Sequence, residues 1–288
     1  MAEISAATVV KLRKMSGQGM MDCKKALEES GGDLDKAVEI LRKKGLATLA
    51  KRAERETSEG AVVSWRSEDG KSAALATLCC ETDFVAKSDD FLAMVDAVRG
   101  YMAGATSPEG PQNLLQTVIG GRNFQEILTE AVSKTGEKIQ VGDFVRFRLE
   151  GPGLIGTYVH FNSKVGSMVQ IDASDEKVAG SAALQQAAAD IAMHITASKP
   201  LALDAQSLDP QVVEREKAIY AEQVQNKPPE IVNRIVEGKM KKFYADYCLL
   251  QQPFVKDDTK TVEQILNEAA QQAGGKASVK RFVRFEVG

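Results

Sequence analysis

An α+β fold is predicted for this chain of 288 residues by three features of its sequence. Residues 1–45 hold three runs with apolar residues at helical spacing, separated by glycines. From Gly60 the pattern changes to the alternation of apolar and polar residues that is typical of strands. The order of strand, hairpin and helix then recurs at an offset of about 93 residues, with Gly60 aligned on Gly153. We therefore expect a three-helix N-terminal module and two related α+β subdomains.

The module and its linker are assigned to residues 1–55. Its expected helices span about Ser5–Met15, Gly19–Ser30 and Asp33–Lys44. Asp33 is a suitable N-cap, because its side chain can accept hydrogen bonds from the free amides of the first turn. Glycines near the end of each run, with Gly45 after the third, are expected to terminate the helices.

A basic run follows within residues 42–55, where only Glu54 carries negative charge. Its members are Arg42, Lys43, Lys44, Lys51, Arg52 and Arg55. We interpret the run as a solvated linker helix, and a phosphate- or ribosome-facing patch is the alternative.

The first subdomain is expected at residues 56–140. Strands 61–65 and 73–79 flank the turn Glu68-Asp69-Gly70, which is a hairpin signal. A helix follows, whose apolar face consists of Phe91, Val95, Val98 and Met102. A second helical stretch covers 123–134. The second subdomain, at 141–288, is expected to repeat this scheme with strands 144–149, 157–161 and 168–171 and a helix over 181–197.

An antiparallel helical hairpin at about 208–248 is expected to interrupt the second subdomain. The pair Pro228-Pro229 divides two amphipathic runs, and it cannot lie inside a helix. Because such a hairpin exposes an apolar stripe, we interpret it as an association element, with a dimer as one possibility.

Composition excludes several functional classes. Lys and Arg number 37 against 40 Asp and Glu, a net charge of −3, which argues against a protein that chiefly binds nucleic-acid backbone. The four cysteines form no CxxC pair and there are only two histidines, so no metal site is expected. Unpaired cysteines, no secretory signal and no apolar stretch of membrane-spanning length predict a cytoplasmic protein without a membrane partner.

Two motifs resemble nucleotide sites without their context. Gly151–Gly156 spells GxGxxG, but the residues that follow predict a strand where a dinucleotide site requires a helix. Gly70-Lys71-Ser72 lacks the glycine of a phosphate loop five positions earlier, where Trp65 stands. We expect no cofactor and no direct nucleotide binding. We interpret Cys79-Cys80 as packed strand thiols rather than nucleophiles, since no histidine is near in sequence.

The segment Thr82–Lys87, TDFVAK, follows a strand and precedes a helix. Its residue types favour a capped turn in which Thr82 is the N-cap and Asp83 lies at the positive end of the helix. On this interpretation Phe84 packs against the core as a hydrophobic staple.

Six segments in order, TDFVAK among them, resemble the bacterial translation elongation factor Ts family over essentially the whole chain. The other five are Gly19–Leu27, His194–Pro200, Glu237–Phe243, Gln252–Val255 and Arg284–Gly288. The resemblance implies a non-enzymatic guanine-nucleotide exchange factor for the GTPase elongation factor Tu. Such a factor binds the GDP-bound GTPase, expels GDP and holds the nucleotide-free form until GTP enters.

The resemblance also implies roles for particular residues. The N-terminal module would have a ubiquitin-associated-like fold and dock on the GTPase domain through Met20, Met21, Asp22 and Lys24. A loop beside the nucleotide would disturb the magnesium coordination, and it consists of Thr82, Asp83, Phe84 and Val85. His160 matches a histidine that touches the partner, and the hairpin at 208–248 corresponds to a coiled-coil insertion.

Two departures from the family pattern and two rival functions remain. The chain stops at Gly288, where some members continue into a C-terminal helical module, and Ile139–Asp143 lacks the arginines usual there.

A small-molecule enzyme is disfavoured, because no catalytic motif is recognisable. An RNA- or ribosome-associated translation factor without exchange activity could use the basic run and Lys239–Lys242.

Overall fold

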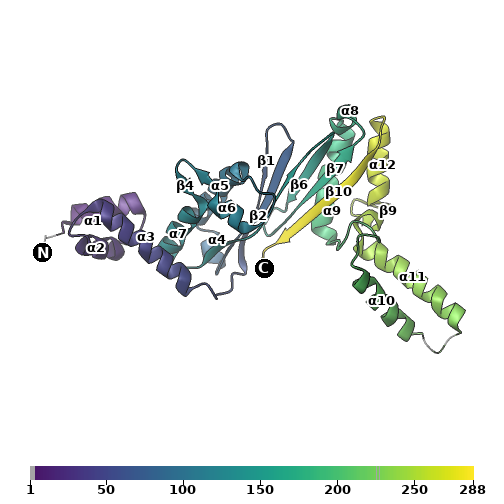
Figure 1. Cartoon of the computed structure of the whole chain (residues 1–288), viewed down its shortest axis with the longest axis horizontal. Coiled ribbons are helices and arrows are strands. Elements are labelled where there is room, and N and C mark those ends of the chain that lie inside the picture. Colours follow the sequence, from purple (N-terminus) through teal and green to yellow (C-terminus); the bar gives the residue numbers. More distant parts are fainter. Residues whose placement is uncertain (1–3, 225, 227) are drawn as a thin grey trace. The chain divides into compact units, whose positions relative to one another are not determined.

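The computed structural model describes residues 4–224, 226 and 228–288. These residues form two compact units, whose helices and strands are labelled in Figure 1. Unit 1 holds the chain up to Trp65, Ala74–Arg146 and Glu286–Gly288, and unit 2 holds Arg66–Ala73 and Phe147–Phe285. None of the helices described is both long and apolar enough to cross a bilayer.

Unit 1 begins with the three predicted helices, α1 (Ala6–Ser16), α2 (Met20–Glu29) and α3 (Leu34–Lys51). Asp33 caps α3 as predicted, because its Oδ1 accepts hydrogen bonds from the amides of Asp35 and Lys36. The three helices enclose a small core of their own, which consists of Val9, Leu12, Cys23, Ala26, Leu27, Ala37 and Leu41.

The prediction that α3 ends at Gly45 is wrong, since the helix continues to Lys51. Gly45 lies where α3 packs on α7 (Phe124–Thr135). A Cβ atom at this position would lie 2.9 Å from the carbonyl oxygen of Thr129. The glycine therefore allows a close helix contact and does not end the helix, a distinction that depends on a partner far away in sequence.

The first sheet has the strand order β1-β2-β5. Its strands are β1 (Glu59–Arg66), β2 (Ser72–Cys80) and β5 (Ile139–Arg148). Helices α5 (Asp89–Gly104) and α7 contribute Phe91, Met102 and Phe124 to a shared core with these strands. The shorter elements are α4 (Asp83–Ala86), α6 (Pro111–Gln116), β3 (Val118–Ile119) and β4 (Arg122–Asn123). Residues 144–149, which we assigned to the second subdomain, fall largely in β5 and thus complete the first sheet.

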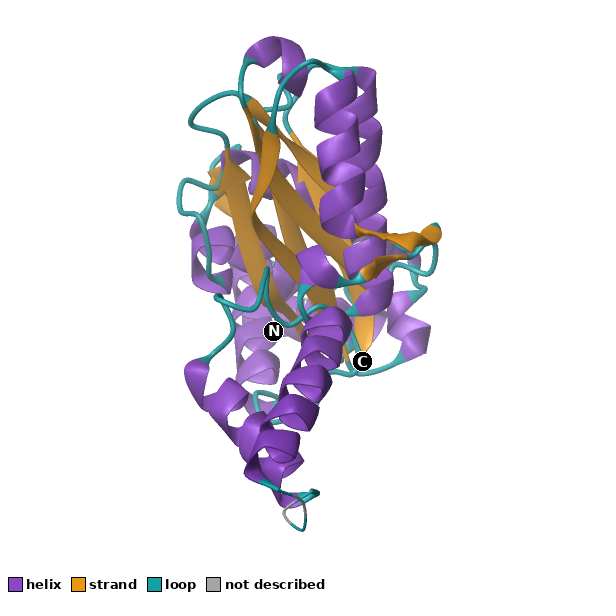
Figure 2. Ribbon diagram, turned by 90° about the vertical axis from the view of Figure 1, so that its right-hand side faces the viewer, coloured by secondary structure: helices purple, strands orange, loops and turns teal. Residues whose placement is uncertain are grey.

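The second sheet has the order β10-β7-β6 and lies in unit 2. Its strands are β6 (Gly153–Val159), β7 (Val165–Ala173) and β10 (Ala277–Glu286). Helices α9 (Ala182–Ser198) and α12 (Val262–Gln272) pack against each other, and α9 covers β6 and β7 (Figure 2). The smaller elements are α8 (Glu176–Ala179), the 3-10 turn Leu249–Gln251, β8 (Pro253–Phe254) and β9 (Asp257–Thr261).

Gly153–Gly156, the second part of the GxGxxG motif, form the start of strand β6, and a strand rather than a helix continues from the motif, as predicted. The strand begins at Gly153, four residues earlier than expected, and pairs antiparallel with β7. At Gly156 a Cβ atom would lie 2.4 Å from the carbonyl oxygen of Ala188, so the glycine admits α9 close to the strand. This glycine therefore serves helix packing, not a phosphate.

The two units repeat one plan, which confirms the predicted relation between the subdomains. Helices α4 and α8 begin 93 residues apart, at Asp83 and Glu176, and α5 and α9 follow serine caps at Ser88 and Ser181. The same offset relates Gly60 to Gly153, each pressed against a carbonyl of the next strand. Beyond α9 the offset grows to 138 residues, as in the N-caps Asn123 of α7 and Thr261 of α12.

The growth of the offset reflects the predicted insertion, which contains α10 (Pro210–Glu222) and α11 (Pro229–Tyr247). At its base, the amide of Leu201 donates to the carbonyl of Tyr247. Apolar side chains near the base cover one another, whereas Ile219 and Ile231 are exposed. Part of the link between the two helices lies outside the described residues.

A buried histidine joins the insertion to the second core. His194 is fully buried, and its Nδ1 accepts a hydrogen bond from the amide of Val255 at 3.2 Å. The ring proton is therefore on Nε2, which donates to Oε1 of Gln252 at 2.9 Å. The side-chain Nε2 of Gln252 in turn donates to the backbone carbonyls of Asp246 in α11 and Ser198 in α9.

Acid is expected to destabilise the protein through His194. Burial lowers the pKa of the imidazole and outweighs the opposing hydrogen bond to Gln252. The unfolded chain therefore binds the proton more tightly, so this contribution to stability is present above about pH 6.5 and is lost as the pH falls. We expect the free energy of unfolding to decrease by up to about 1.4 kcal/mol per pH unit from this site. Urea titrations at pH 7, 6 and 5 should show a weaker decrease for His194→Gln, and parallel decreases would contradict the assignment.

Candidate functional site

The turn α4 between β2 and α5 is fixed at both ends. Thr82 is the N-cap, as predicted, and its Oγ1 accepts a hydrogen bond from the amide of Val85. Ser88 caps α5 directly after the turn by accepting a hydrogen bond from the amide of Phe91. Val85 is 9% exposed and packs in the core of unit 1. Val85 therefore anchors the turn and faces the core.

Phe84 lies on the outer side of this turn and is 84% exposed. The interpretation of Phe84 as a hydrophobic staple is therefore wrong, because Val85 occupies the inward position of the turn. The second repeat supports this conclusion, since Val178 is buried at the position of Val85 and the exposed Lys177 stands at that of Phe84. The fold thus accepts a charged residue where this unit presents an aromatic ring.

Asp83 and Lys87 flank Phe84 on the surface. Their side chains pair at 2.7 Å between Oδ2 and Nζ. The hydrogen bond from Lys87 is the main cause of a lowered pKa for the Asp83 carboxyl group. The turn therefore presents an ionised carboxylate beside an exposed ring.

Two carboxylates behind the turn hold it in place. Glu137 accepts hydrogen bonds from the amide and the hydroxyl of Thr82, at 3.1 and 2.8 Å. Glu81 accepts from the amide of Lys138 and pairs with Arg52 and Arg55. Burial would raise the pKa of Glu81, but these hydrogen bonds outweigh burial and lower it to about 2.

Glu81 and Glu137 were not among the residues that the sequence singled out. Glu81 directly precedes the TDFVAK segment, which is a weak signal. Glu137 is separated from Thr82 by 55 residues, and no local pattern predicts that pairing.

The basic run is exposed to solvent as predicted, with Arg52 alone partly buried, but four of its six cations form ion pairs. Besides the pairs of Arg52 and Arg55 with Glu81, Arg42 pairs with Glu126 and Lys44 with Asp22. Lys43 and Lys51 are exposed. Carboxylates therefore neutralise much of the charge that a phosphate-binding surface would need.

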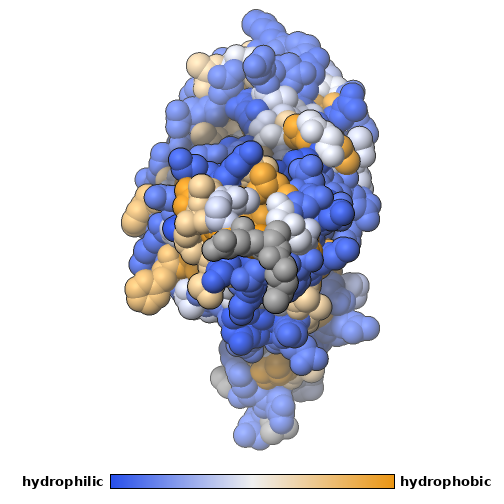
Figure 3. Space-filling model, turned by 90° about the vertical axis from the view of Figure 1, so that its left-hand side faces the viewer, coloured by the Kyte–Doolittle hydropathy of each residue, from blue (hydrophilic) through white to orange (hydrophobic). Residues whose placement is uncertain are grey.

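The predicted docking residues lie at the start of α2 in unit 1. Met20 is 39% exposed and Met21 is 64% exposed, while Asp22 pairs with Lys44 and Lys24 with Glu28. Viewed from the side of the N-terminal helices, the surface shows hydrophobic residues among hydrophilic ones (Figure 3). Two exposed methionines on one rigid helix offer an apolar contact to a partner.

His160 lies in unit 2, at the end of the β6–β7 hairpin. Its Nδ1 is 3.1 Å from the hydroxyl of Tyr158, and its ring is 4.4 Å from that of Phe161. Phe161 is 91% exposed. The sequence predicted a strand ending at this residue, but no pattern indicated that its ring would be left outside the core. A cavity of about 300 Å³ beside His160 is lined by Tyr158, Val165 and Val255, among others.

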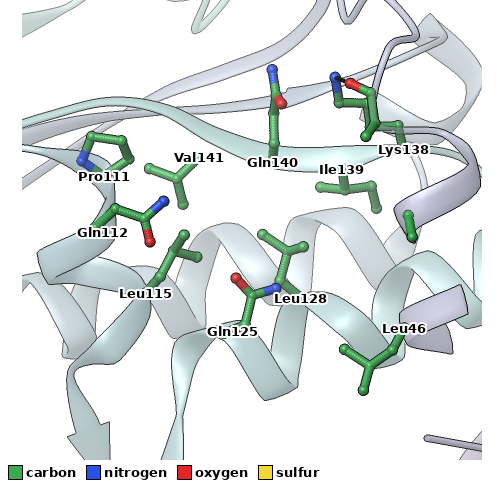
Figure 4. Close-up of a pocket in the computed structure, with 12 residues that line it drawn as sticks. Leu46, Pro111, Gln112, Leu115, Gln125, Leu128, Lys138, Ile139, Gln140 and Val141 are labelled. Carbon is green, nitrogen blue, oxygen red and sulfur yellow. Dashed lines mark hydrogen bonds between the residues drawn. The ribbon is translucent and has the colours of Figure 1, made fainter. Parts of the chain in front are cut away.

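A second cavity, of about 330 Å³, lies in unit 1 among α3, α6, α7 and β5 (Figure 4). Leu46, Leu115 and Leu128 form much of its wall. Lys138 is its charged lining residue, and its Nζ donates to the carbonyls of Ala53 and Arg55. Among the described residues, no group of three His, Cys, Asp or Glu side chains is placed to hold a metal ion.

Known proteins match the chain along its whole length. The family model described as elongation factor TS matches residues 81–288. Elongation factor Ts of Nitratiruptor sp. is 44% identical over 287 residues, which cover 99% of this chain and 93% of that protein. Elongation factor Ts of Alkalilimnicola ehrlichii is 44% identical, and the match covers 99% of this chain and 92% of that protein. Elongation factor Ts of Clostridium botulinum is 42% identical, and the match covers 99% of this chain and 93% of that protein. The chain belongs to the elongation factor Ts family and is a translation elongation factor.

Proposed function

We propose that this chain is a guanine-nucleotide exchange factor for elongation factor Tu. It binds the GDP-bound GTPase, loosens the magnesium and phosphate site, releases GDP and holds the nucleotide-free form until GTP binds. It performs no covalent chemistry and works in the cytoplasm. The observation that carries the proposal is the exposed Phe84 on a turn fixed by Thr82, Val85 and Ser88.

A rigid, exposed aromatic ring suits the displacement of a nucleotide. Its contact area is already oriented, so little conformational entropy is lost when it enters a partner. Binding energy at Phe84 lowers GDP affinity only if the ring fits the empty GTPase better than the loaded one, and the coupling is then reciprocal. Magnesium joins the phosphates to the surrounding loops, so displacing its ligands weakens the hold on the diphosphate.

The other contacts are assigned to surfaces in both units. Met20 and Met21, with Asp22 and Lys24 beside them, dock the helical module on the GTPase domain. His160 contacts the same partner from unit 2. Thr82 and Val85 support the exchange turn from within, while Asp83 and Phe84 face the partner.

An RNA- or ribosome-associated role without exchange is less well supported. The basic run would have to supply free cations, yet Arg42, Lys44, Arg52 and Arg55 all pair with carboxylates. RNA binding through phosphate contacts would also weaken steeply with added salt.

Release of a fluorescent GDP analogue from purified elongation factor Tu tests the proposal. We expect the full chain to accelerate release in a saturable manner at fixed magnesium concentration. An unchanged release rate, at concentrations where the two proteins form a complex, would exclude exchange and favour the alternative.

Docking through the module predicts a loss of affinity in the double variant Met20→Ala, Met21→Ala. Truncating a well-buried contact residue costs roughly 2 kcal/mol, which corresponds to about a 30-fold weaker Kd. Isothermal titration calorimetry measures the Kd, and circular dichroism verifies that the module remains helical. Met15→Ala is the matched control, because Met15 is an exposed methionine of the same module that faces a cavity against α7. Equal affinities of the double variant and the control would contradict the docking assignment.

A further inference from the structure

We propose that Glu137 and Glu81 are positioning residues for exchange, which hold the Phe84 turn rigid and tie it to the helix that carries the docking module. The inference rests on the proposed exchange function and goes beyond it, because neither carboxylate belongs to the surface expected to touch the partner.

The first step is the geometry of Glu137. Both of its carboxylate oxygens are used by Thr82, one by the backbone amide and one by the hydroxyl. Thr82 in turn caps α4 through the same hydroxyl oxygen. The direction in which α4 leaves the sheet is therefore set by the carboxylate of Glu137, which lies between α7 and β5, and Phe84 extends from that turn.

The second step is the path from the turn to the module. Glu81 precedes Thr82 and accepts hydrogen bonds from Arg52 and Arg55, both at 2.8 Å. These arginines follow the C-terminus of α3, whose other end belongs to the three-helix core with Met20 and Met21 on its surface. In the pair of Arg52 with Glu81 the two side chains are only 25% and 14% exposed, so solvent screens this pair less than an ordinary surface ion pair.

The third step is a comparison inside the chain itself. The residue of unit 2 that corresponds to Glu81 is Ser174, 93 positions later in the sequence. The residue that corresponds to Glu137 is Gly275, 138 positions later. Ser174 and Lys276 there exchange hydrogen bonds without any carboxylate from these two positions. Unit 2 builds the same strand, turn and helix, with Lys177 in place of Phe84.

The fold of this turn therefore does not require the two carboxylates. The two carboxylates occur in unit 1, which exposes Phe84, and other residues replace them in unit 2, where Lys177 stands at the position of Phe84. This coincidence favours a role in presenting the ring to a partner, since a purely structural requirement would apply to both repeats.

Stopped-flow release of a fluorescent GDP analogue from elongation factor Tu tests the proposal with the full chain. We expect Glu137→Ala and Glu81→Gln each to lower the maximal rate of GDP release at saturating factor about tenfold. The concentration of factor that gives the half-maximal release rate should change little. Glu137→Gln, which keeps one acceptor oxygen, should recover part of the rate. Glu126→Gln is the matched control, because Glu126 is also a partly buried, arginine-paired carboxylate of unit 1.

A double-mutant cycle with Phe84→Ala separates positioning from general stability. If Glu137 acts through Phe84, its replacement should have almost no further effect once the ring is removed. Additive losses, or variants as fast as Glu126→Gln, would overturn the inference while leaving exchange intact. Failure of the wild-type chain to accelerate release would instead overturn the proposed function.

Discussion

Phe84→Ala is expected to slow stimulated GDP release about 30-fold at saturating factor, with a melting temperature close to that of the wild type. The ring is 84% exposed, so its removal opens no cavity in the core. A central aromatic contact in an interface contributes roughly 2 kcal/mol or more, and here that energy is used for displacement of the nucleotide. Stopped-flow release and thermal melts measure the two effects separately.

The chain supplies two matched controls for this variant. Phe84→Lys copies Lys177 of the second repeat, so it should fold normally and still lose exchange. Phe161→Ala removes another exposed ring, from unit 2, and should not lower the rate at saturation to the same extent. A normal release rate combined with a large drop in melting temperature for Phe84→Ala would return the residue to a structural role.

Gly60→Ala is expected to destabilise the protein by more than about 4 kcal/mol. A Cβ atom at Gly60 would lie 2.0 Å from the carbonyl oxygen of Leu78 in the neighbouring strand, and the φ angle of +140° is one that L-residues rarely adopt. The backbone of β1 would have to move away from β2, and the core of unit 1 would open with it. Thermal melts measure the loss, and hydrogen exchange should locate it in unit 1.

Comparison with other glycines makes this prediction specific. Gly153→Ala introduces the equivalent contact in unit 2, 2.5 Å from the carbonyl of Ile171, and should destabilise that unit less because its φ angle is not positive. Gly120→Ala is the control, since φ is +58° there but nothing lies within 4 Å of the added carbon. A melting temperature for Gly60→Ala no lower than that of Gly120→Ala would show that the strands adjust readily.

Interactions between residues close in sequence were predictable. The caps at Asp33 and Thr82, the strand that continues from the GxGxxG motif and the helix break at Pro228-Pro229 all depend on a few neighbouring residues. The relation between the two halves was also visible as an offset, because a repeated plan repeats its turn and cap residues.

The errors in the fold share one physical cause. The termination of α3 at Gly45 was wrong, and the strand expected at 144–149 lies largely in β5 of the first sheet, because each feature depends on a distant partner. A glycine that ends a helix and one that admits a second helix have the same local pattern. Likewise, an alternating strand carries no mark of the strand with which it pairs.

The sequence by itself determined the family, the order of the elements and the turn that carries the candidate site. Only the tertiary structure decided that Val85 is anchored inside while Phe84 lies in solvent, and that Glu137 holds Thr82 from 55 residues away. The physical reason is that burial depends on what lies opposite a side chain after folding. In a turn of four residues, two adjacent apolar side chains compete for one inward position, and the surrounding core selects the residue that occupies it.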